Sequence, residues 1–171
     1  MRILLLGATG FLGRHICARL LAEGYLVVAA VRDSQSARRR FPDIETVTLD
    51  MNCMVEAEDW EPYLANVDAV INCAGILQST LGQSAFAIHT RSPIALFEAC
   101  AAANVRRVIQ ISAVSADSAA GTEYALTKKK PLMTISNRST WIGRCYALRS
   151  SMLKAALAAP RRYAVWRGCR S

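Results

Sequence analysis

Short runs of aliphatic residues alternate along this chain with segments whose apolar positions recur at helical spacing. Most of the runs are typical of strands that are buried on both faces of a parallel sheet. One of them, residues 44–49, alternates between apolar and polar positions as a half-buried strand does. The five strands predicted in this way cover residues 3–6, 26–31, 44–49, 69–73 and 108–111.

The segments between these strands predict helices. Gly24 stands where a helix that has just ended needs a left-handed residue. Ser34 is in position to cap a short basic helix, and Pro93 lies near an internal start within the longest helix. The helices are expected over residues 11–23, 34–40, 54–65 and 84–103.

Strands that alternate with helices form βαβ units, whose right-handed crossovers produce a parallel sheet with helices on both faces. We therefore predict an α/β, doubly wound Rossmann domain over residues 1–130, which we expect to be incomplete at its C-terminus. Residues 131–171 are predicted to be an atypical basic segment and no separate domain. A length of 171 residues suits one domain of common size.

The first strand runs directly into a glycine-rich turn and then a helix. In this turn Gly7 permits a sharp bend, Gly10 leaves space for a phosphate, and Gly13 lets the helix approach the strand. Because amides at the helix start then face an anion, a dinucleotide pyrophosphate is the predicted ligand. The alternative is a turn that packs tightly and binds nothing. The expected cofactor-binding residues here are Gly7, Thr9, Gly10, Phe11, Leu12 and Gly13.

Further candidates follow the other strands, because ligands of such sheets lie beyond the carboxyl ends of the strands. Arg32 and Asp33 end the second strand. A cation there favours the extra phosphate of NADP, so we expect NADP, with NAD possible; a solvated basic face is the alternative. Asp50 is expected at the adenine edge, and Ala74 with Gly75 at the cofactor ribose.

Tyr124 and Lys128 are four residues apart, which places them on one face of a helix. An ammonium beside a phenol stabilises the phenolate and makes it a better acid–base catalyst near neutral pH. Lys128 is also expected to bind a nicotinamide ribose hydroxyl. The alternative is a surface tyrosine packed on a lysine stem. His89 has no acid or thiol arranged with it in the sequence, so we expect a packed or capping histidine.

With residues 7–13, 72–75 and 124–128 in view, the chain resembles the short-chain dehydrogenase/reductase superfamily. The spacing is most similar to its extended and atypical members, which include NmrA-like proteins, complex-I-accessory-subunit-like proteins and NAD-dependent epimerase/dehydratase relatives. Residues 108–117 are similar to the fifth strand and following loop of that branch. The resemblance covers residues 1–130.

The resemblance implies roles for three side chains. It implies that Tyr124 is a general acid–base and that Lys128 lowers the tyrosine pKa and binds ribose. It also implies a serine or threonine that polarises the substrate carbonyl or alcohol. Ser112 is the nearest candidate for that role, and Ser115 is a rival because the serine of many extended members lies slightly later.

Composition excludes some classes of function. The net charge is +8, yet all 13 acidic residues lie within residues 1–130, where basic residues balance them, so the excess lies in residues 131–171. That segment has no nucleic-acid-binding motif, so nucleic acid is not an expected partner. Charged residues interrupt the apolar segments and no signal peptide is recognised, so we expect a cytoplasmic protein without a membrane span. The six cysteines are scattered, which favours buried free thiols and no metal site.

Residues 131–171 depart from the family, whose members continue the tyrosine helix and add a sixth strand that ends in an Arg-Pro-like turn. Here Pro131 disfavours helical geometry, and no carboxylate follows. Our preferred hypothesis is a translated frameshift or a truncated gene, because abundant Arg, Ser, Cys and Trp without acids is typical of out-of-frame GC-rich coding sequence. A divergent basic terminus is the alternative.

Two functions are compatible with these residues. The leading hypothesis is an NADP-preferring oxidoreductase or epimerase/dehydratase-like enzyme that moves hydride between nicotinamide and a small carbonyl or alcohol. The alternative is a nonenzymatic NAD(P)H-binding sensor or assembly factor. The sequence specifies neither the substrate nor the oligomeric state.

Overall fold

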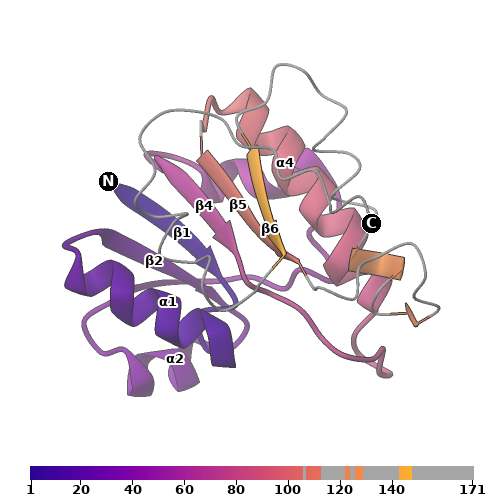
Figure 1. Ribbon diagram of the computed structural model, residues 1–171, viewed down its shortest axis with the longest axis horizontal. Helices are drawn as coiled ribbons and strands as arrows, with labels where there is room; N and C mark the ends of the chain where they lie inside the picture. The colour runs from indigo at the N-terminus through magenta and orange to yellow at the C-terminus, as the bar shows by residue number, and fades with distance from the viewer. Residues whose placement is uncertain (106, 113–121, 124–125, 129–142, 148–171) are drawn as a thin grey trace, which may run out of the picture.

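The computed structural model describes residues 1–105, 107–112, 122–123, 126–128 and 143–147 (Figure 1). Its centre is a six-stranded sheet in the order β3-β2-β1-β4-β5-β6, in which every neighbouring pair is parallel. The predicted doubly wound α/β fold is confirmed, because strand order reverses direction at β1. The strands are β1 (Arg2–Leu6), β2 (Leu26–Val31), β3 (Glu45–Thr48), β4 (Ala69–Asn72), β5 (Arg107–Ser112) and β6 (Gly143–Ala147).

Helices cover both faces of the sheet. Helices α1 and α2 lie on one face, and α3 and α4 lie on the other (Figure 1). A 3-10 turn, η1, follows α3, and a π-helical turn, η2, precedes α4. Their bounds are α1 (Phe11–Ala22), α2 (Ser34–Arg40), α3 (Ala57–Trp60), η1 (Glu61–Tyr63), η2 (Ala87–Arg91) and α4 (Ser92–Ala102).

Two predicted helices differ from those observed. The helix predicted over residues 54–65 is the short α3 followed by η1, because the Asp59 carboxylate accepts the backbone N–H groups of Val55 and Glu56 and so delays the start. The helix predicted over 84–103 contains η2 before α4 begins. Pro93 has no N–H to donate at this junction, which favours the wider turn over a regular α-helix.

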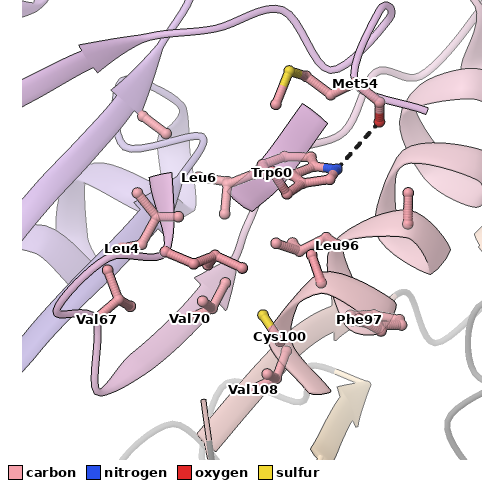
Figure 2. Packing of buried hydrophobic residues seen from close by; sticks show 14 of the residues in the cluster. Leu4, Leu6, Met54, Trp60, Val67, Val70, Leu96, Phe97, Cys100 and Val108 are labelled. Atoms are coloured by element: carbon pink, nitrogen blue, oxygen red, sulfur yellow. Dashed lines mark hydrogen bonds between the residues drawn. The ribbon is translucent and has the colours of Figure 1, made fainter. Parts of the chain in front are cut away.

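Hydrophobic side chains fill both faces of the sheet. Along β1, Leu4 and Leu6 join the cluster on one face, and Ile3 and Leu5 join the cluster on the other, as alternation along a strand requires. Trp60 is fully buried in the first cluster, where its Nε1 donates to a backbone carbonyl of the preceding loop at 3.3 Å (Figure 2). These two cores hold the carboxyl ends of the strands in fixed positions.

The sixth strand was not predicted from the sequence. It pairs with β5 over five positions, from Val108 beside Gly143 to Ser112 beside Ala147. Residues 143–147 contain no run of aliphatic residues, so the hydrophobic pattern gives no signal for a strand. The sheet therefore continues into the segment that the sequence analysis separated from the domain.

The expectation of buried free thiols was partly wrong. Cys17, Cys53, Cys73 and Cys100 are all free, and Cys17 and Cys100 are buried. Cys53 is exposed, since it lies in the turn after β3 and not on an apolar face. Within the described ranges, no helix is long and apolar enough to cross a membrane.

Candidate functional site

A glycine turn joins β1 to α1 at the carboxyl edge of the sheet. Gly7 adopts a φ of 75°, which is left-handed, so a side chain is strained there. A Cβ on Gly13 would lie 2.0 Å from the Gly7 carbonyl oxygen, an impossible contact. A Cβ on Gly10 would lie 3.2 Å from the same oxygen, which is tight but less severe. The turn therefore brings the helix start as close to β1 as backbone atoms allow.

The first turn of α1 presents backbone amides at this edge. Gly10 is the N-cap residue and has no side chain to accept these amides. Phe11 is 71% exposed and Leu12 is also exposed, so neither buries the helix start. The Arg14 guanidinium lies 5.0 Å from the centre of the Phe11 ring and places a cation nearby. This end of the helix suits an anionic ligand.

The ends of β2 and β3 carry exposed polar groups. Arg32 is exposed beyond β2. The Asp33 carboxylate accepts the Gln35 N–H at 2.9 Å at the start of α2, so the prediction of Ser34 as the cap was wrong. Asp50 is exposed beyond β3, and its carboxylate accepts a backbone N–H two residues later at 2.9 Å. Asp33 and Asp50 thus each stabilise a turn of their own.

Lys128 joins the ends of β4 and β5. Its Nζ donates to the Ala74 carbonyl oxygen at 3.1 Å and to the Ile111 carbonyl oxygen at 3.4 Å, and the residue is only 6% exposed. Gly75 leaves room for this approach, because a Cβ there would be in tight contact with Nζ, at 3.1 Å. A Cβ on Gly7 would lie 2.8 Å from the Ala74 nitrogen. The structure therefore brings the glycine turn, residues 74–75 and Lys128 to one edge.

Two buried amides that the sequence analysis missed support this edge. Asn72 and Gln110 are neighbours in the pairing of β4 with β5, and the Asn72 amide donates to the Gln110 side-chain oxygen at 2.8 Å. Gln110 donates in turn to the Ile111 carbonyl, and Asn72 accepts the Ala74 N–H at 3.0 Å. Polar residues inside two otherwise aliphatic strands were a signal for this network, since buried polar groups need partners.

His89 is buried behind the same edge. Its Nε2 accepts the Ile76 N–H at 3.0 Å, and its Nδ1 lies 2.9 Å from the Thr127 hydroxyl. Burial and the nearby Lys128 ammonium lower the pKa of His89 to about 4, whereas the Glu123 carboxylate acts in the opposite direction. The ring is therefore neutral at neutral pH. Burial similarly raises the pKa of the Cys73 thiol to about 12, although Lys128 lowers it, so Cys73 stays a thiol.

A hollow of about 530 Å³ opens beside this cluster. The Ser79 hydroxyl donates to the Glu123 carboxylate at 2.7 Å across it, which ties the loop after β4 to the helical segment that holds Lys128. Leu77 is exposed in the same loop. The hollow is lined by Leu77, Gln78, Ser79, Thr122 and Glu123.

The structure does not describe the side chains of three predicted catalytic residues. Tyr124 and Ser115 lie outside the described residues. Ser112 ends β5, at the correct edge of the sheet, but its side chain lies outside the description. Lys128 is the predicted catalytic residue whose side-chain contacts are described.

Solved structures share this fold. WbmG from Bordetella bronchiseptica in complex with NAD has a TM-score of 0.72 at 17% identity, over 86% of this chain and 52% of that chain. The UDP-glucuronic acid 4-epimerase from Bacillus cereus in complex with NAD has a TM-score of 0.71 at 19% identity, over 86% and 56%. At these identities the likeness shows the fold alone.

Curated relatives are similar in sequence. The photosystem II assembly factor Ycf39 of a Synechocystis species is 30% identical over 137 residues, which are 80% of this chain and 39% of the relative. The mitochondrial 40 kDa subunit of NADH-ubiquinone oxidoreductase from Neurospora crassa is 30% identical over 126 residues, which are 72% and 34%. The chain thus spans little more than a third of these relatives.

The sequence model of the NAD dependent epimerase/dehydratase family matches residues 3–137. This match contains β1 from its second residue onward, β2 to β5, the glycine turn and Lys128. It confirms the resemblance to the extended short-chain dehydrogenase/reductase branch. This chain belongs to the NAD dependent epimerase/dehydratase family.

Proposed function

We propose that this chain is an NADP-preferring oxidoreductase or epimerase/dehydratase-like enzyme that acts on a small carbonyl or alcohol. The family is NAD dependent by its description, so the cofactor class is a nicotinamide dinucleotide. The observation that carries the proposal is the position of the Lys128 ammonium, 3.1 Å from the Ala74 carbonyl and at the same edge as the glycine turn. A dinucleotide binds across such an edge with its pyrophosphate at the glycine turn, and Lys128 lies where the same ligand would pass.

The residues present fit this cofactor. The glycine turn leaves the amides of α1 open to a pyrophosphate, and Gly10 has no side chain in the path. Gly75 leaves backbone exposed to a ribose beside Lys128. Our proposal assigns the phosphates to residues 7–13 and the nicotinamide ribose to Lys128, with Ala74 and Gly75. Asp50 keeps its proposed place at the adenine edge.

The preference for NADP is proposed from the end of β2. Asp33 already accepts a helix N–H, whereas the exposed Arg32 offers a cation. A guanidinium forms charge-assisted bonds to a phosphate and none of comparable strength to a neutral hydroxyl. This arrangement supports NADP over NAD.

The chemistry assigned to the chain is proton transfer and positioning. When bound, the nicotinamide supplies or accepts the hydride. We assign the proton to the Tyr124 hydroxyl, four residues before Lys128 in the sequence. The Lys128 ammonium stabilises the phenolate, and Ser112, or its rival Ser115, polarises the substrate oxygen. The hollow beside Glu123 is the proposed place for a small substrate.

A second candidate is a nonenzymatic NAD(P)H-binding sensor or assembly factor. Its support is the similarity to a relative named as a photosystem II assembly factor, which is 30% identical over 137 residues. We further propose a cytoplasmic location, which fractionation of cells tests.

Thermal unfolding with NADPH and with NADH, followed by a panel of small carbonyls, separates these functions. A ligand that binds the native state raises the melting temperature, and more so the tighter it binds. We therefore expect NADPH, the preferred coenzyme, to raise the melting temperature more than NADH. Turnover of a carbonyl supports the enzyme, and stabilisation without turnover supports the binder. If neither coenzyme changes the melting temperature, both proposals fail.

A further inference from the structure

Two successive residues of the π-helical turn hold a single residue of the helical segment that contains Lys128. The His89 Nδ1 lies 2.9 Å from the Thr127 hydroxyl, and the Thr90 hydroxyl donates to the Thr127 carbonyl at 2.9 Å. His89 is 1% exposed, and Thr90 is also buried. A π turn has more residues per turn than an α-helix, so neighbouring side chains point in more similar directions. This geometry lets both residues reach Thr127.

The hydrogen bonds around His89 have one consistent direction. Because Nε2 accepts the Ile76 N–H, the neutral ring carries its proton on Nδ1, which donates to the Thr127 hydroxyl. That hydroxyl donates in turn to the Glu123 carbonyl at 2.7 Å. The other neutral tautomer would place two N–H groups against each other at Ile76. The ring therefore joins the loop after β4 to the segment that holds Lys128.

Lys128 follows Thr127 directly, and its ammonium lies close to the same histidine. A Cβ placed on Gly75 would lie 3.1 Å from the Lys128 Nζ and 3.3 Å from the His89 Nε2. Both nitrogens thus lie next to one backbone position, residue 75. Thr127 fixes the start of the lysine side chain, and the Ala74 carbonyl fixes its end.

We infer that His89 is a positioning residue, whose neutral ring connects Ile76 to Thr127 and so fixes the Lys128 ammonium beside Gly75. Its value for cofactor binding rests on the proposed function above. Among the residues that the structure describes, the charged groups that act on the ring are Lys128 and Glu123. A protonated ring would add a cation beside Lys128 and turn Nε2 into a donor facing the Ile76 N–H. Burial also lowers the pKa of His89 to about 4, which agrees with a neutral connector.

The first test uses cofactor-free protein and the rate at which acetic anhydride acetylates Lys128, measured by mass spectrometry relative to the rate in urea. Thr127→Val keeps the shape and removes the hydroxyl, whereas Thr127→Ser keeps the hydroxyl. We expect Thr127→Val to raise the rate roughly two- to tenfold, the effect of one lost neutral hydrogen bond. Thr127→Ser and the control Thr46→Val, on β3, should keep the original rate. Equal rates in folded Thr127→Val and the unmutated chain would overturn the inference.

The histidine itself is tested by two substitutions, each of which keeps one of the two hydrogen bonds that the ring makes. The amide of Asn reaches about as far as Nδ1, and that of Gln about as far as Nε2. We expect His89→Asn, which retains the hydrogen bond to Thr127, to protect Lys128 from acetylation better than His89→Gln. Long-range proton–nitrogen NMR of the unmutated chain should show a neutral ring protonated on Nδ1. A proton on Nε2, or equal protection in both variants, contradicts the assignment.

Cofactor fragments separate positioning from general destabilisation. Thr127→Val should weaken NADPH roughly two- to tenfold and leave adenosine 2′,5′-bisphosphate unchanged, because that fragment has no nicotinamide ribose to contact Lys128. Equal losses for both ligands would indicate a merely structural role. If the unmutated chain binds no NADPH, the proposed function fails, while acetylation and NMR still decide the role of His89.

Discussion

The proposed cofactor site has two halves, the glycine turn and the surroundings of Lys128, and one consists of backbone whereas the other consists of side chains. The glycine turn is made of backbone, and its shape depends on the absence of side chains at Gly7 and Gly13. The Lys128 half is made of side chains from distant parts of the chain, held by buried hydrogen bonds that involve His89. The first half is fixed by local sequence, whereas the second exists only after the sheet has formed. Substitutions should therefore damage the halves in different ways.

The largest expected effects on turnover separate acid–base chemistry from binding. If the chain is catalytic, Tyr124→Phe should lower turnover roughly 100- to 10,000-fold with little change in cofactor affinity. Lys128→Met should lower both, because the ammonium serves the cofactor and the tyrosine. Steady-state kinetics with fluorescence titration of NADPH measures the two effects. Unchanged turnover in folded Tyr124→Phe would remove Tyr124 from the mechanism.

In the glycine half, a side chain at Gly13 should act through folding. Gly13→Ala forces a Cβ to within 2.0 Å of the Gly7 oxygen, so we expect a loss of more than about 3 kcal/mol in the free energy of unfolding. Gly10→Ala is the matched control, because its Cβ meets that oxygen at 3.2 Å and the φ of Gly10 is an ordinary −72°. Urea denaturation compares the two. Equal losses would show that the turn lacks this close packing.

The Lys128 half should respond to acid. The pKa of His89 is lowered from 6.5 to about 4 in the folded chain, so its contribution to stability is complete above pH 6.5 and disappears as the pH falls toward 4. We expect a loss of about 3 kcal/mol from this group over that interval. Urea denaturation from pH 7 to 4 should show that the free energy of unfolding depends less on pH in His89→Asn than in the unmutated chain. The exposed His15→Asn control should follow the unmutated chain, and a shared profile for all three would refute the shift.

The smallest expected effect concerns coenzyme choice. Arg32 is exposed, so water screens its charge, and Arg32→Ala should weaken NADPH by roughly tenfold while NADH changes little. Parallel titrations measure the ratio, and Arg38→Ala, at an exposed arginine on the nearby helix α2, is the control. Equal changes for both coenzymes would assign Arg32 to the solvated basic face.

The sequence predicted the backbone half of the site better than the side-chain half. Glycines between a strand and a helix indicate a turn that is too tight for side chains, and the close contact of Gly13 with the Gly7 carbonyl oxygen is such a case. The role of His89 depends on Thr127, which is 38 residues away, so local pattern could place it only as a packed residue. The strand at 143–147 was missed because its pairing with β5 outweighs its weak propensity. The π turn before Pro93 was missed although the proline, which lacks an N–H, was a local signal for an irregular turn.

The frameshift hypothesis for residues 131–171 has a consequence that the genetic code fixes. A frame that reads the last base of each codon with the first two of the next must encode Asp across Met133 and Thr134, and again across Trp141 and Ile142. These assignments hold for every synonymous codon, and they restore carboxylates to a segment that has none. We therefore propose that sequencing the gene will show this frame open through residue 171; stop codons in it would favour a divergent terminus.

Calorimetric titration of NADPH into the unmutated chain and into Gly10→Val tests the central claim most directly. The account predicts saturable binding at one site in the unmutated chain. It also predicts a severe loss of affinity in Gly10→Val, whose branched side chain occupies the space proposed for the pyrophosphate, although circular dichroism shows a folded protein. Equal affinities in the two folded proteins, or no binding to the unmutated chain, would contradict the account.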